Sequence, residues 1–82
     1  MIVLSFETKR SQKKILDKAV KYFVDDVGLR VTEQGDCCVH FADRNQLGYV
    51  KVTIAQKDGK SEVDVESREF DYHAKKFVSE FK

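Results

Sequence analysis

The 82-residue sequence predicts an α+β fold of order β-α-β-β-β-β-α, a two-layer sandwich in which an antiparallel meander sheet carries both helices on one face. The first observation is Asp58-Gly59, which separates two stretches of alternating apolar residues. This dipeptide favours a β-hairpin, because a type I′ turn needs positive φ at both central residues. The second observation is a pair of segments with apolar residues at helical spacing, which can cover one face of a sheet whose other face meets water.

The hairpin at Asp58-Gly59 also predicts its own register. Folding the chain there pairs Val52 with Val65 on one face of the two strands. Lys51 then faces Glu66 on the other face, a favourable cross-strand pair that was not used to choose the register.

The N-terminal part predicts a strand followed by a helix. Residues 2–6 alternate as a strand does, Thr8 or Ser11 can cap the helix, and Gly28 can end it in a left-handed conformation. The apolar stripe of this helix consists of Ile15, Leu16, Ala19, Val20, Phe23 and Val27. The pattern leaves two positions open for the first strand, either beside the last strand or parallel to the second.

A second hairpin is predicted around residues 34–36, which form a polar turn. Folding there pairs Val31 with Val39 and Leu29 with Phe41, so that apolar residues again meet on one face.

The C-terminal segment predicts a second amphipathic helix that opens at Ser67. Glu69 and Asp71 then fall in its first turn, where the helix dipole favours carboxylates. The apolar stripe of this helix consists of Phe70, Ala74, Phe77, Val78 and Phe81.

Length and composition predict one domain over residues 1–82 with a heavily charged surface. The chain is 41% hydrophobic and 35% charged, and its formal net charge is +1, so bulk charge does not indicate a partner. No apolar run approaches the roughly 20 residues that cross a bilayer, and the N-terminus has no basic leader. We therefore expect a cytoplasmic protein without membrane association.

The two cysteines are adjacent, at Cys37 and Cys38. Within a strand, successive side chains point to opposite faces, which disfavours a disulfide between neighbours. We therefore expect reduced thiols, with Cys37 as a small residue of the core.

The first helix carries a basic stripe that predicts contact with polyanions such as nucleic acids or phosphates. One acidic residue, Asp17, stands against six basic ones between residues 9 and 21. The basic residues are Lys9, Arg10, Lys13, Lys14, Lys18 and Lys21. A solvated helix face without a ligand is the alternative, since lysine is common there. Lys57 and Lys60, beside the hairpin turn, are expected near the start of this helix.

An acidic pole is the alternative candidate site. The meander gathers at one end of the sheet five carboxylates: Asp25, Asp26, Asp43, Glu69 and Asp71. Ca²⁺ is the cofactor that such a set would bind, because it accepts carboxylate and carbonyl oxygens together. An acidic rim without a ligand is the other interpretation, since the sequence has no Asp-x-Asp-x-Asp-Gly loop.

The uncovered sheet face is a third candidate, as an enzyme site. Register places His40, Lys51 and Glu66 in one row across three strands, close enough for proton transfer. Cys38 and His40 could supply two metal ligands, but a third and fourth are not evident. A flat, solvated face without a pocket is the competing expectation.

Together these patterns predict a small binding or interaction module rather than an enzyme, because the sequence contains no catalytic motif. A polyanion or a protein is the expected partner, and a monomer or a weak dimer is the expected state.

Overall fold

The computed structural model describes residues 1–45 and 47–81, and the fold class predicted from the sequence is confirmed. The strands are β1 (Ile2–Thr8), β2 (Arg30–Gln34), β3 (Cys38–Ala42), β4 (Tyr49–Lys57) and β5 (Lys60–Arg68). They form one sheet in the order β1-β5-β4-β3-β2, and every neighbouring pair is antiparallel. Of the two positions left open for the first strand, the one beside β5 is correct.

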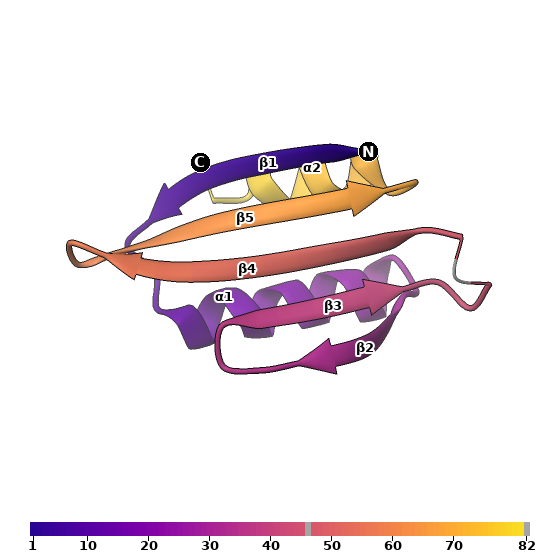
Figure 1. The fold of residues 1–82 in the computed structure, drawn as a ribbon, viewed down its shortest axis with the longest axis horizontal. Coiled ribbons are helices and arrows are strands. Elements are labelled where there is room, and N and C mark those ends of the chain that lie inside the picture. Colours follow the sequence, from indigo (N-terminus) through magenta and orange to yellow (C-terminus); the bar gives the residue numbers. More distant parts are fainter. Residues whose placement is uncertain (46, 82) are drawn as a thin grey trace.

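Two helices cover one face of this sheet (Figure 1). Helix α1 (Gln12–Val20) continues directly into a π-helical segment, η1 (Lys21–Asp26), and α2 (Asp71–Ser79) follows β5. Helix α1 carries the chain behind the sheet from β1 at one edge to β2 at the other (Figure 1). In the described residues, none of the helices is long and apolar enough to cross a membrane.

The register predicted for the central hairpin is confirmed. Val52 faces Val65 and Lys51 faces Glu66. Asp58 and Gly59 have φ of 52° and 78°, as a turn with positive φ at both central residues requires.

The register predicted for the β2–β3 hairpin is wrong. Val31 faces Phe41 and Gln34 faces Val39, with a bulge between Val31 and Glu33. All five residues of β2 are exposed at the sheet edge, so burial does not fix the pairing of this strand. The turn therefore lies at residues 35–37, one position later than predicted.

The start predicted for the second helix is also wrong. Strand β5 continues to Arg68, and Ser67 lies in that strand with its side chain fully buried. Glu69 adopts a left-handed φ of 71°, which separates β5 from α2, and the helix begins at Asp71. Alternation of buried residues therefore continues two residues past Val65 before the chain turns.

Local chemistry accounts for both ends of the first helix. The Ser11 side chain accepts a hydrogen bond from the Lys14 amide at 3.3 Å, which confirms Ser11 as the N-cap. Gly28 has φ of 92°, and the Leu29 amide beyond it donates to the Phe23 carbonyl at 2.8 Å. The helix widens to π geometry before this glycine, which the spacing of apolar residues did not predict.

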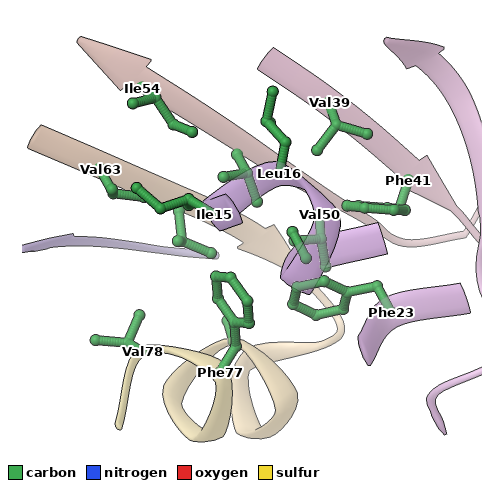
Figure 2. Close-up of a cluster of buried hydrophobic side chains, with 14 of the residues drawn as sticks. Ile15, Leu16, Phe23, Val39, Phe41, Val50, Ile54, Val63, Phe77 and Val78 are labelled. Carbon is green, nitrogen blue, oxygen red and sulfur yellow. The ribbon is translucent and has the colours of Figure 1, made fainter. Parts of the chain in front are cut away.

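The core lies between the sheet and the two helices (Figure 2). Phe23 packs between Phe41 of β3 and Phe77 of α2, with ring centroids 5.2 and 5.3 Å apart. All three rings are fully buried. This aromatic contact joins η1, which continues α1, and α2 to strand β3 of the sheet.

Candidate functional site

The basic residues of the first helix lie opposite the buried side of α1. Ile15, Leu16 and Ala19 are buried against the sheet, while Lys13 and Lys14 are exposed. In the part of the chain that the structure describes, none of the six predicted basic residues lies within 4.0 Å of a carboxylate oxygen. We call these six residues the basic surface: Lys9, Arg10, Lys13, Lys14, Lys18 and Lys21.

Two members of the basic surface are held over one aromatic ring. The guanidinium carbon of Arg10 and the Nζ of Lys18 lie 5.0 and 5.1 Å from the centroid of the Phe81 ring. Phe81 itself stacks on Phe6 of β1, at a centroid distance of 5.0 Å. Cation–π contacts of this length are attractive and restrict where the two charges can go. These contacts of Phe81 were not predicted, because the sequence indicated Phe81 only as part of the apolar stripe of the second helix.

The turn between β4 and β5 lies at the same end of the molecule as the start of α1, as predicted (Figure 1). The Ser61 hydroxyl donates to the Arg10 carbonyl at 2.9 Å and ties the two segments together. Lys57 and Lys60 at this turn are each close to a carboxylate, on Glu62 at 3.8 Å and Glu7 at 4.0 Å. These two lysines add less unpaired charge to this end of the molecule than the basic surface does.

A hollow of about 250 Å³ lies where the basic surface meets the end of α2. Its walls are formed by Lys18, Lys21, Tyr22, Asp26 and Glu80. Burial is the main cause that raises the pKa of the Tyr22 phenol, and Glu80 adds to the effect. Because two carboxylates face two lysines here, this hollow favours an anion less than the exposed side of α1 does.

The five predicted acidic residues lie on elements that do meet at one end of the sheet (Figure 1). Asp43 is engaged by the turn that follows β3, where its Oδ1 accepts the Leu47 amide at 2.8 Å. Asp25 and Asp26 are exposed at the end of η1, and Glu69 precedes α2 rather than lying in its first turn. Within residues 1–45 and 47–81, no group of three His, Cys, Asp or Glu side chains could hold a metal ion. Calcium binding at the acidic pole therefore has no support from the described residues.

The rows predicted for the open sheet face are confirmed. His40 faces Lys51, and Lys51 faces Glu66, across β3, β4 and β5. The three side chains do not form one hydrogen-bonded set, however. Glu66 accepts the Tyr49 hydroxyl at 2.6 Å, and the His40 Nδ1 lies 3.5 Å from a Glu33 carboxylate oxygen on β2.

The open face carries a hollow that is partly open to solvent, whereas no pocket was expected there. A hollow of about 440 Å³ lies over β3 and β4, beside the bulged strand β2. Residues that line it include Glu33, Gln34, Cys38, His40, Lys51 and Thr53. We call this the open-face hollow. The hollow was not predicted because alternation in the sequence does not indicate the β2 bulge, which places Glu33 opposite His40.

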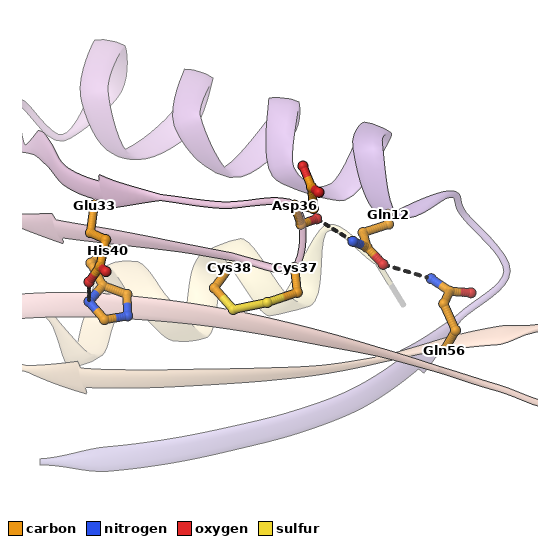
Figure 3. The surroundings of a disulfide bond; sticks show 7 residues. All are labelled: Gln12, Glu33, Asp36, Cys37, Cys38, His40 and Gln56. Carbon is orange, nitrogen blue, oxygen red and sulfur yellow. Dashed lines mark hydrogen bonds and ion pairs between the residues drawn. A yellow bond between two sulfur atoms is a disulfide. The ribbon is translucent and has the colours of Figure 1, made fainter.

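A disulfide joins Cys37 to Cys38 at the edge of the open-face hollow (Figure 3). The prediction of free thiols is therefore wrong, and so is the placement of Cys37 in the core, since Cys37 is exposed. The physical reason is the shifted turn. Cys37 lies in that turn rather than in β3, so the rule of opposite faces does not apply to the pair.

Comparison with known proteins adds no family to these observations. The chain matches no protein-family model and no curated protein sequence.

Proposed function

We propose that this protein is a small binding module whose basic surface contacts the phosphates of a nucleic acid. The observation that carries the proposal is the concentration of six cations on and beside α1 without a carboxylate within 4.0 Å of any of them, among the described residues. Unpaired cations are the groups that displace condensed counterions from a phosphate backbone.

The spacing along the helix suits a linear polyanion. Lys14 and Lys18 are four residues apart, which corresponds to about 6 Å along a helix axis. Phosphates of one DNA strand advance about 3.4 Å each along the duplex, so the two lysines span about two nucleotides. Arg10 and Lys18, restrained over Phe81, lose less conformational freedom on binding than unrestrained side chains.

The contact is expected to be insensitive to base sequence. Lysine meets phosphate as a point charge, and phosphate contacts position a protein without reading base edges. The aromatic ring that two cations of the basic surface contact, Phe81, is already stacked on Phe6. It therefore does not supply the exposed stacking platform that single-strand recognition uses.

Fluorescence anisotropy with a labelled oligonucleotide, measured over a series of salt concentrations, tests the proposal. The test variant is Lys13→Gln/Lys14→Gln, which removes two exposed cations from α1. The matched control is Lys75→Gln/Lys76→Gln, which removes two adjacent exposed cations from α2 and gives the same net charge.

In the test variant, the slope of log affinity against log salt should fall by about 0.7 to 0.9 for each lysine that contacts a phosphate. The control should keep the slope of the wild type. Equal losses in both variants would show attraction by net charge alone, and an unchanged slope in the test variant would remove α1 from the interface.

A further inference from the structure

The Cys37–Cys38 disulfide is placed where it can do little for the stability of the fold. A disulfide stabilises a protein mainly by closing a loop of chain in the unfolded state, and the gain grows with loop length. These two cysteines are one position apart in the sequence, so no loop of chain is closed. The turn already has other fixed contacts, including the Ile54 amide that donates to the Cys37 carbonyl at 2.8 Å.

The same disulfide is accessible to a reagent. Cys37 is exposed in the turn between β2 and β3, and Cys38 lines the open-face hollow. Figure 3 shows both sulfur atoms on the side of the sheet away from α1. Exposed disulfides are the labile, regulatory or catalytic ones, in contrast to the buried bridges that hold secreted domains together.

Charged side chains share the open-face hollow with Cys38. Lys51, His40 and Glu33 all line it, and a Glu33 carboxylate oxygen lies 3.5 Å from the His40 Nδ1. In residues 1–45 and 47–81, no carboxylate oxygen lies within 4.0 Å of the Lys51 ammonium, and the facing Glu66 accepts a hydrogen bond from Tyr49. A nearby unpaired cation lowers the pKa of a thiol and makes it a better leaving group in disulfide exchange.

We propose that Cys37 and Cys38 form a redox site that oxidises a low-molecular-weight dithiol by thiol–disulfide exchange. A thiolate of the substrate attacks Sγ of Cys37, the bond between the two protein sulfurs breaks, and Cys38 leaves as a thiolate in the hollow that Lys51 also lines. The second substrate thiolate then attacks the substrate sulfur of the mixed disulfide, and Cys37 leaves.

The exchange balances without another reactant. The substrate loses two electrons and becomes a cyclic disulfide, and the protein disulfide gains them. The two protons of the substrate thiols end on Cys37 and Cys38. A cyclic disulfide returns the protein to its oxidised state by the reverse steps.

A small substrate fits the size and charge of the site. The open-face hollow, at about 440 Å³, lies within the range of small-molecule pockets. Gln34 and Thr53 add polar groups to a lining that also carries Glu33 and Lys51, which suits a small, uncharged and solvated dithiol.

Alkylation and mass spectrometry of the full-length chain test this proposal, with dihydrolipoamide as the reductant and lipoamide as the oxidant. The air-oxidised protein should take up no iodoacetamide under native conditions. After dihydrolipoamide it should take up two alkyl groups, and after lipoamide it should again take up none. Two reactive thiols that persist in lipoamide would overturn the proposal, as would reduction by a protein dithiol but not by dihydrolipoamide.

Two sets of variants separate a redox site from a passive surface bridge. Lys51→Gln should slow reduction by about threefold or more, and Lys51→Arg should restore the rate, because the leaving thiolate loses and regains its cation. Lys57→Gln on the same strand, outside the hollow, is the control and should react as the wild type does. An unchanged rate in Lys51→Gln would contradict the site as described.

Cys37→Ser should fold with a circular dichroism spectrum and a Tm close to those of the wild type, because the bridge closes no loop. Loss of the fold in this variant would assign the disulfide a structural role and overturn the proposal. Neither result depends on nucleic-acid binding, since α1 is unchanged in all of these variants.

Discussion

Tyr49 donates its phenolic hydrogen to Glu66 at 2.6 Å across β4 and β5, although the residue that faces Glu66 in register is Lys51. This diagonal contact changes which side chain pairs with the Glu66 carboxylate on the open face. It engages the carboxylate that faces Lys51 in register, while Lys51 lines the open-face hollow.

The same hydrogen bond predicts a change of stability at high pH. The bond to Glu66 is the main cause that raises the pKa of the Tyr49 phenol above its usual value of about 10. The folded state therefore favours the protonated phenol, so its contribution to stability is complete below pH about 10 and is lost as the pH rises through the folded pKa. Wild type should lose stability relative to Tyr49→Phe only above pH about 10, as measured by urea unfolding at several pH values. A constant difference up to pH about 11 would contradict the hydrogen bond.

Two buried serines on β5 should respond in opposite ways to replacement by alanine. The Ser61 hydroxyl donates to the Arg10 carbonyl, whereas the buried Ser67 hydroxyl has no hydrogen-bond partner among the described residues. Ser61→Ala should cost about 1 to 2 kcal/mol, because it leaves a carbonyl without its donor. Ser67→Ala should be neutral or stabilising, since it removes an unsatisfied polar group from the core. Chemical denaturation of both variants measures the difference, and equal losses would show that Ser67 has a partner.

Much of the fold could be predicted from the sequence, because burial on one face fixes the register of central strands. Val52 and Val65 are both fully buried, and a slip of one residue would expose them to water. The edge strand β2 has no such constraint, so neither its bulge nor the turn that contains Cys37 could be predicted from alternation. The open-face hollow and the disulfide both depend on that turn, which is why they were missed.

The basic surface was more predictable than the open face, since helical spacing alone places its lysines. The restraint by Phe81 was not predictable, because it depends on how the end of the chain packs against β1 and α1. Topology places the elements that carry the carboxylates of the acidic pole at one end of the sheet. Among the described residues these carboxylates do not come together as a group of three that could hold a metal ion, and topology alone does not contain such detail.

Gly48 should tolerate a methyl group poorly, because it lies against the junction between β5 and α2. A Cβ atom there would lie 2.6 Å from the Arg68 carbonyl oxygen and 2.8 Å from the Glu69 Cβ. Gly48→Ala should therefore destabilise the protein by about 1 to 3 kcal/mol. Gly35→Ala is the matched control, since nothing lies within 4 Å of a Cβ at that position. Thermal unfolding of the two variants compares them, and a similar Tm would place Gly48 in a more open site than the structure shows.

The most direct test of the binding proposal is a ¹⁵N NMR titration of the protein with a short oligonucleotide at low salt. Amide shifts should concentrate on α1 and the segment before it, at Lys13, Lys14 and Arg10, and they should diminish as salt is added. Shifts confined to the open sheet face around His40 and Lys51, or the absence of shifts on α1, would contradict the binding proposal.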